Sequence, residues 1–221
     1  MRARYTSLLH SLTALAVSGC LPSSTPLQSD RPFSYLAMRY EATVPQGQDF
    51  TCGAASLATV LTYYWGDRTT ESDVLEVLRG RYTKQEMQKK AVDGLSFDDL
   101  IYAAERLGFS AQGGIVPEAE LANLQGPVIV RLKKSERFQH FVVLRKVGDG
   151  VFYLSDPVVG QSTESYADFH AQYTGDALAI WRKGAPLPRA ARLTSPRDGI
   201  SVSNSLARAI NGPQVTLQKG L

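Results

Sequence analysis

The chain has 221 residues, of which 43% are hydrophobic, and this is enough for one well-packed domain without requiring a second. Its formal charge of +3 falls to +1 when Arg2 and Arg4 of the N-terminal segment are set aside, because 22 basic residues then face 21 acidic ones. Such a balanced chain lacks the charge excess of polyanion-binding proteins, and we expect no nucleic-acid partner.

The first 19 residues have the layout of a signal peptide. A basic start is followed by a modest apolar run over residues 12–17 and by small residues before Cys20. This run is shorter than the roughly 20 apolar residues that a membrane span needs. The sequence Leu-Ala-Val-Ser-Gly-Cys over residues 15–20 resembles a bacterial lipobox, in which the cysteine is acylated and becomes the new N-terminus. We therefore expect a periplasmic lipoprotein, and Leu21 favours the outer membrane as the site of its anchor.

Residues 20–34 are rich in Pro and Ser and are predicted to form a linker between the anchor and the fold. The chain contains one cysteine besides Cys20, namely Cys52. If Cys20 is acylated, Cys52 is the only free thiol of an exported protein, which suggests a reactive residue. The alternative is a disulfide between the two cysteines in an oxidising compartment, although it would tether a core helix to a signal-proximal tail.

After an extended segment over residues 35–44, the sequence predicts a helix that begins at or just before Cys52. Its apolar residues recur at intervals of three and four up to Trp65, and Gly66 is a natural stop. The unpaired N–H groups and the positive end of the helix dipole favour a thiolate at this place. The alternative is a buried structural cysteine, because free cysteines are among the most buried residues.

Further helices are predicted from residue 71 to 79 after Thr70, more weakly over 82–92, and from Phe97 to Gly108 after a capping box of Ser96 and Asp99. The remaining elements, in chain order, are a strand at 109–112, a helical turn at 117–124, strands at 126–132, 138–146 and 151–155, a helix at 165–173, and a strand at 177–182. A turn at Gly148-Asp149-Gly150 joins two of these strands as an antiparallel hairpin. Helices followed by an antiparallel sheet predict an α+β domain over residues 35–183.

Residues 184–221 lose this periodicity and are predicted to form a mostly disordered tail. The tail is basic: residues 182–221 carry 7 basic and 1 acidic side chains, or +6, whereas residues 20–181 carry 15 and 20, or −5.

A cysteine nucleophile needs a base, and the chain beyond its signal segment offers two histidines. His140 begins a hydrophobic strand that can hold its ring steady. His170 lies in a polar helix, where a solvated surface residue is the more ordinary interpretation. The pairing of His140 with a cysteine at a helix start therefore favours His140 as the base.

The predicted hairpin brings the end of strand 151–155 beside the start of the His140 strand. Asp156 can then accept a hydrogen bond from the imidazole and fix its tautomer. The alternative is a turn, because Asp-Pro is common at strand ends. For the oxyanion, the Cys52 backbone N–H is one donor, and the side chain of Gln46 or Gln48 could be the second.

Over about residues 40–181 the sequence resembles the papain-like cysteine peptidases, most closely the bacteriocin-processing, double-glycine leader peptidases (family thirty-nine of clan CA). The resemblance is carried by Gln46 six places before the cysteine, Cys-Gly-Ala-Ala from Cys52, His-Phe-Val-Val-Leu from His140, and Asp156-Pro157 with Gly160 after it. It implies a papain-like fold in which Gln46 is the oxyanion-hole residue, Cys52 the nucleophile, His140 the base and Asp156 the orienter.

Two departures bear on specificity. Thr51 stands where many members of that family have Asp immediately before the cysteine, which puts leader specificity in question. Leader peptidases are also often fused to a transporter, and its absence here suggests a free-standing enzyme.

The export signal and size are similar to those of the cysteine proteases that accompany functional-amyloid secretion systems. This resemblance implies a protein or peptide substrate, such as an amyloid subunit or its export machinery, that is processed or subjected to quality control. We expect a cysteine endopeptidase without metal or cofactor, because two histidines and one free thiol are too few for a metal-ligand cluster. The alternatives are a catalytically silent peptide-binding accessory and a thiol acyltransferase or amidase.

Overall fold

The structure is a computed structural model that describes residues 35–134, 139–188, 191 and 193. The predicted signal peptide, Cys20, the linker and most of the basic tail lie outside the described residues. Within the described ranges, none of the helices is long and apolar enough to cross a membrane.

Apart from α1, the described helices follow the predicted order closely. They are α1 (Tyr35–Arg39), α2 (Cys52–Thr59), α3 (Glu71–Arg81), α4 (Lys84–Asp93), α5 (Phe97–Arg106), α6 (Glu118–Leu121) and α7 (Tyr166–Gln172). Thr70, Thr83 and Ser96 each close a capping box at the start of α3, α4 and α5. The predicted Ser96–Asp99 box is thereby confirmed.

The helix that begins at Cys52 changes its winding before it ends. All eight residues of α2 are buried, and the chain continues as a π-helical turn over Val60–Tyr64. Gly66, with a φ of +74°, follows this turn and ends the helical segment as predicted.

The prediction of an extended segment over residues 35–44 is wrong for its first half, where α1 forms instead. Four of the five α1 residues, Leu-Ala-Met-Arg, are strong helix formers. The helix is also fixed by tertiary contacts, because side chains at its end bind backbone carbonyls of a distant loop. Such contacts cannot be recognised from the local sequence.

One antiparallel sheet of six strands has the order β1-β6-β2-β3-β4-β5. Its strands are β1 (Ser110–Ile115), β2 (Val128–Lys133), β3 (Gln139–Gly148), β4 (Val151–Asp156), β5 (Gly160–Ser165) and β6 (Tyr173–Trp181). Asp149 and Gly150, both at positive φ, form the predicted turn between β3 and β4. The edge strand β5 was not predicted, because its sequence Gly-Gln-Ser-Thr-Glu-Ser has no apolar pattern.

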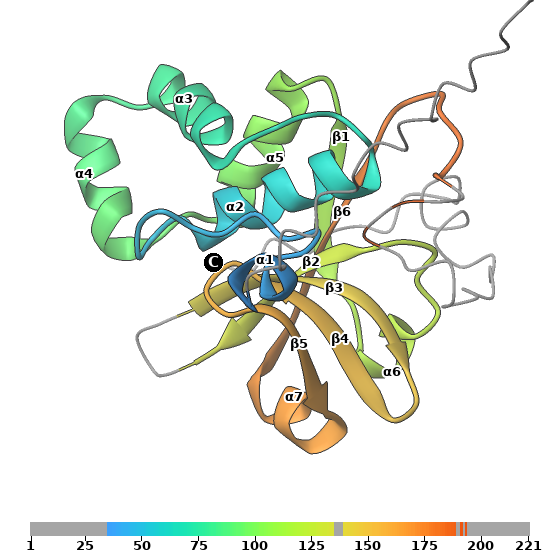
Figure 1. The fold of residues 1–221 in the computed structure, drawn as a ribbon. Coiled ribbons are helices and arrows are strands. Elements are labelled where there is room, and N and C mark those ends of the chain that lie inside the picture. Colours follow the sequence, from blue (N-terminus) through green and yellow to red (C-terminus); the bar gives the residue numbers. More distant parts are fainter. Residues whose placement is uncertain (1–34, 135–138, 189–190, 192, 194–221) are drawn as a thin grey trace, which may run out of the picture. The chain divides into compact units, whose positions relative to one another are not determined.

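Each face of the sheet buries its own apolar cluster. Helices α2, α3 and α5 cover one face, where Leu57, Val74 and Leu100 pack with Val143 of β3. On the other face, Phe169 of α7 stacks on Phe152 of β4 with ring centroids 3.8 Å apart. Figure 1 shows the two groups of helices on opposite sides of the strands. Helices followed by an antiparallel sheet confirm the predicted α+β class.

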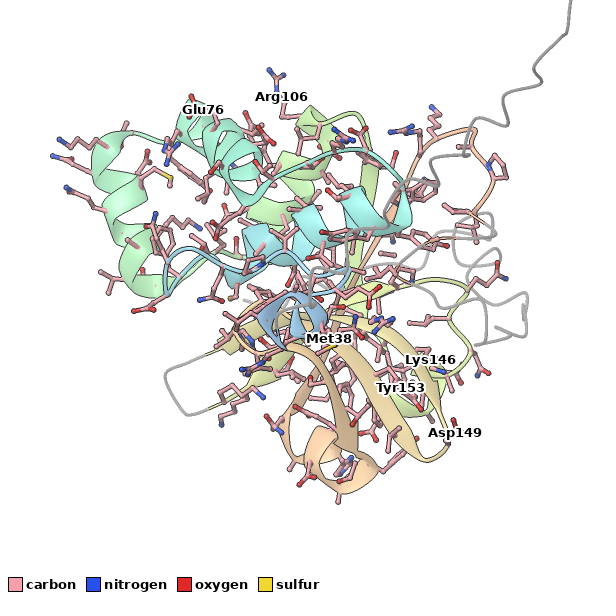
Figure 2. The ribbon with its side chains drawn as sticks, in the orientation of Figure 1. Met38, Glu76, Arg106, Lys146, Asp149 and Tyr153 are labelled. Atoms are coloured by element: carbon pink, nitrogen blue, oxygen red, sulfur yellow. The ribbon has the colours of Figure 1, made fainter. Side chains whose placement is uncertain are left out.

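The hairpin between β3 and β4 projects away from helices α2 to α5 (Figure 1). Figure 2 shows Lys146, Asp149 and Tyr153 around its turn. The ammonium of Lys146 lies 4.2 Å from the centroid of the Tyr153 ring, and the Tyr153 hydroxyl donates to an Asp149 carboxylate oxygen at 3.3 Å. These local contacts support the interpretation of Asp149 as a turn residue.

Asp99 ties α4 to the rest of the helical layer. The Asp99 side chain is fully buried and accepts hydrogen bonds from Lys90 of α4, at 2.6 Å, and from Tyr82 and Ser96. Burial alone would raise the pKa of Asp99, but these hydrogen bonds hold it below its ordinary value. Helix α4 has no buried residue, and Lys90 attaches it to this carboxylate.

Two buried residues among those described lie within the segment 184–221 that was assigned to the tail. Ala191 and Leu193 are buried and belong to the cluster on the helical face. The Leu193 N–H donates to the Tyr63 carbonyl at 3.2 Å, and its carbonyl accepts from the Arg145 guanidinium at 2.8 Å. Ala191 and Leu193 therefore pack on the domain, whereas residues 184–187 are exposed.

Candidate active site

Cys52 is the first residue of α2 and only 8% of its surface is exposed. The loop before it is closed by Thr51, whose hydroxyl donates to the Gln48 carbonyl at 2.8 Å and accepts from the Gln48 N–H at 3.2 Å. Because the Thr51 side chain makes no cap hydrogen bond to α2, it orders the loop and leaves the first N–H groups of the helix unpaired by its hydroxyl.

Helix α2 approaches strand β3 closely beside the cysteine. A Cβ added to Gly53 would lie 3.1 Å from a ring carbon of Phe141 and 3.2 Å from a methyl carbon of Leu100, so glycine permits this separation. One turn later, the Ser56 hydroxyl donates to the Phe141 carbonyl at 3.0 Å. The helix that carries Cys52 is therefore fixed against the residue that follows His140.

His140 is the second residue of β3, and 13% of its side chain is exposed. Its Nε2 donates to Asp156 Oδ1 at 2.9 Å, and the ring also interacts with the side chain of Cys52. Burial alone would lower the pKa of His140, but the hydrogen bonds and charges of Asp156 and Cys52 raise it to about 9. The structure thus holds an imidazole between a thiol and a carboxylate.

Asp156 ends strand β4, and its side chain is 8% exposed. Its Oδ1 accepts from His140 and also from the backbone N–H groups of Val158, at 2.7 Å, and Val159, at 3.3 Å. Burial would raise the pKa of this carboxyl, but the hydrogen bond from His140 and those backbone donors hold it below its ordinary value. Asp156 is therefore ionised at neutral pH and accepts from three donors.

Gln46 lies in the loop before α2. Its N–H donates to the Pro157 carbonyl at 3.0 Å, which attaches it to the loop after Asp156. The side-chain amide donates to the Gln48 carbonyl at 2.9 Å, while its Oε1 is buried without a hydrogen-bond partner among the described residues. No hydrogen bond within the described part of the chain joins this side chain to Cys52, His140 or Asp156.

Comparison with known proteins identifies the family of this chain. Residues 41–185 match the peptidase C39 family. The chain belongs to this family. Since the family consists of cysteine peptidases, the protein is one of them.

Two relatives of the C39 peptidase share a name. The chain is 29% identical over 170 residues to the "Probable functional amyloid protease FapD" of Pseudomonas aeruginosa, which covers 77% of this chain and 73% of that protein. The protein of the same name from Pseudomonas fluorescens is 32% identical over 147 residues, or 66% of this chain and 63% of that protein.

A solved structure also resembles the C39 peptidase. The peptidase domain of Streptococcus ComA, a bi-functional ABC transporter involved in a quorum sensing pathway, is 25% identical with a TM-score of 0.55. The match covers 65% of this chain and all of that domain.

The other predicted candidates of the C39 peptidase lie elsewhere. The His170 side chain is 78% exposed on α7, where its Nδ1 pairs with Glu118 at 2.8 Å. Cys20 lies outside the described residues. Cys52 is the free cysteine of the described part of the chain.

Sequence reasoning missed Glu71, which contacts the loop that carries Gln46. Its carboxylate accepts from the Gly47 N–H at 2.9 and 3.1 Å. A Cβ on Gly47 would lie 2.9 Å from the same carboxylate, so the glycine allows this approach. The only local signal was the acidic first turn of α3, which is common to many helices.

Proposed function

We propose that Cys52, His140 and Asp156 form the catalytic triad of this cysteine peptidase. The proposal is supported chiefly by the His140 ring, which hydrogen-bonds Asp156 and interacts with the Cys52 side chain. This is the arrangement that nucleophile, base and orienter require.

Peptide hydrolysis follows from a negatively charged Cys52 and a positively charged His140. The Cys52 thiolate attacks the scissile carbonyl carbon, and the protonated His140 then transfers its proton to the leaving amine as the C–N bond breaks. Water hydrolyses the resulting thioester, with His140 accepting the proton of the water, which restores the thiolate–imidazolium pair. Asp156 keeps the imidazole oriented and stabilises its protonated form.

Gln46 is proposed as a side-chain donor to the oxyanion, together with the Cys52 N–H. Its backbone is fixed by Pro157 and the neighbouring Gly47 is fixed by Glu71, so the loop is held at two points. Its amide, now bonded to the Gln48 carbonyl, retains a second N–H for an oxyanion.

The substrate is proposed to be an extended, flexible segment with small residues at the scissile bond, such as paired glycines. A cysteine that opens a helix packed tightly on a strand leaves little room for bulky side chains near the sulfur. A peptide library with Gly-Gly, Gly-Ala or Leu-Phe at its centre tests this, and Cys52-dependent cleavage chiefly at Leu-Phe would reject the narrow site.

The biological setting is proposed to be the processing or quality control of a secreted protein of the amyloid type. It is supported by the similarity to the two proteins named FapD and by the apparent export signal. We further propose that Cys20 carries lipid and holds the enzyme at the periplasmic face of the outer membrane. Mass spectrometry of the mature N-terminus tests the lipid, and recovery of only soluble, unmodified protein would refute it.

The decisive experiment compares the wild type with Cys52→Ala in the native host, followed by mass spectrometry of the exported proteins. We expect a fragment that is present only with the wild type. Hydrolysis leaves a free carboxylate at the new C-terminus, whereas acyl transfer would leave an amide. A wild-type protein whose Cys52 resists iodoacetamide and which produces no fragment would indicate a peptide-binding accessory instead.

A further inference from the structure

The loop between β4 and β5 presents its backbone in two directions. The N–H groups of Val158 and Val159 point inward and donate to Asp156 Oδ1. The carbonyls of Pro157, Val158 and Val159 are bound by other partners. The orientation of the Asp156 carboxylate therefore depends on where this short loop is held.

All three carbonyls are bound by one stretch of chain, residues 39–46, which we call the clamp segment. The Gln46 N–H donates to Pro157 at 3.0 Å, the Tyr40 hydroxyl donates to Val158, and the Arg39 Nε donates to Val159. The clamp segment begins at the last residue of α1 and leads towards Cys52, so it connects the proposed oxyanion residue to the loop of the proposed orienter.

The contact continues into β5. Gly160 has a φ of +83°, and a Cβ at this position would collide with the backbone carbonyl of Arg39. The next residue, Gln161, donates its side-chain amide to the Glu41 carbonyl at 2.6 Å. At Gly160, the first residue of β5, the backbone of the clamp segment thus lies directly on the backbone of the strand.

We infer that Arg39 and Tyr40 are positioning residues for Asp156 and, through Asp156, for His140. The inference rests on the proposed triad and extends it to two side chains that touch neither Cys52 nor His140. Each of them holds a loop carbonyl. The Val158 carbonyl, held by Tyr40, belongs to the same peptide group as the Val159 N–H that donates to Asp156, and the Val159 carbonyl, held by Arg39, belongs to the next peptide group. Release of these carbonyls frees this part of the loop to rotate and misaligns the Val159 donor, which shifts the carboxylate.

The test uses Tyr40→Phe, Arg39→Met and the double variant in the full chain. Tyr166→Phe and Arg106→Met serve as matched controls, since both residues are exposed and lie on α7 and α5. Figure 2 shows Arg106 projecting outward from the helical layer. Circular dichroism and thermal unfolding check that each variant is folded.

The first readout is the NMR titration of His140, assigned by comparison with His140→Gln. In the wild type we expect a pKa of about 9. In the double variant this pKa should fall by about one unit or more toward the ordinary 6.5, because a misaligned Asp156 stabilises the imidazolium less. A purely structural role would change the unfolding temperature and leave this titration unchanged.

The second readout is kinetic. We expect kcat to fall about tenfold in Tyr40→Phe and about a hundredfold in the double variant, with KM changed less than threefold, since neither side chain belongs to the proposed peptide site. If a folded double variant keeps the wild-type titration of His140 and the wild-type kcat, the inference about Arg39 and Tyr40 is wrong, while the proposed triad still stands. A wild-type His140 that titrates near 6.5, with an unreactive Cys52, would overturn the proposed triad itself.

Discussion

His140 interacts with two partners at once, and in the proposed triad this interaction sets the pH range of activity. Its pKa of about 9 keeps the imidazole protonated at neutral pH, as a thiolate–imidazolium pair requires. We expect kcat/KM to be constant between about pH 7 and 8 and to fall about tenfold per pH unit above about 9. A pH–rate profile measures this, and a basic limb near 6.5 would contradict it.

The unfolding free energy should also decrease as the pH rises and His140 loses its proton. The folded pKa of His140 lies above its unfolded value of about 6.5, so its protonation stabilises the folded state fully below pH 6.5, and this contribution is lost as the pH rises through about 9. The difference in unfolding free energy between wild type and His140→Gln should therefore shrink over that interval in denaturant titrations.

The two glutamines before Cys52 allow a matched comparison. Gln46→Ala should lower kcat about 10²- to 10³-fold with little change in KM, because an oxyanion donor acts mainly in the transition state. Gln48→Ala keeps the backbone groups that bind Thr51 and Gln46, and it should retain nearly full activity. If Gln48→Ala produces the larger loss in steady-state assays, the oxyanion residue has been misassigned.

At single residues, the sequence suggested the candidates for the catalytic triad but not the residues that hold the surrounding loops in place. The choice of Cys52 and His140 followed from the scarcity of cysteines and histidines, and Asp156 followed from the hairpin. Glu71 and Tyr40 had no such signal, because each acts by binding a backbone group far away in the chain. Acidic and tyrosine residues are too common for their position alone to reveal this.

The packing of α2 on β3 fixes the distance between the thiol and the imidazole. Gly53→Ala should push the helix away from Phe141, cost about 1–3 kcal/mol of unfolding free energy and reduce kcat/KM at least tenfold. Gly80→Ala is the control, because Gly80 lies in α3 with open space around it and alanine favours a helix there. Denaturant titration and activity assays of both variants check this, and equal behaviour would contradict it.

Elements with local signals were predicted well. The helix start at Thr70, the capping box of α5 and the turn at Asp149-Gly150 depend on residues three or fewer positions apart. The π-helical turn Val60–Tyr64 and strand β5 depend on packing and on pairing with β4, so their own residues did not reveal them. Helix α1 was missed because it depends on contacts to a distant loop as well as on its helix-forming residues.

At the scale of the whole domain, its last described residue belongs to the core. Leu193 is fully buried, whereas Leu187 is 39% exposed. Leu193→Ala should cost about 2–5 kcal/mol of unfolding free energy, and Leu187→Ala should change it by less than about 0.5 kcal/mol. Chemical denaturation of both variants measures this, and a neutral Leu193→Ala would show that its packing contributes little.

The clamp segment has a kinetic consequence. Its contacts with residues 158, 159 and 161 join positions 118 to 120 residues apart, whereas the helices and the β3–β4 hairpin form from neighbours. Closing so long a loop is entropically costly, and contacts of this kind form late in folding. A chain that has gained its helices and hairpin would still lack a fixed Asp156. Enzymatic competence should therefore be the final property to return on refolding, after secondary structure has recovered.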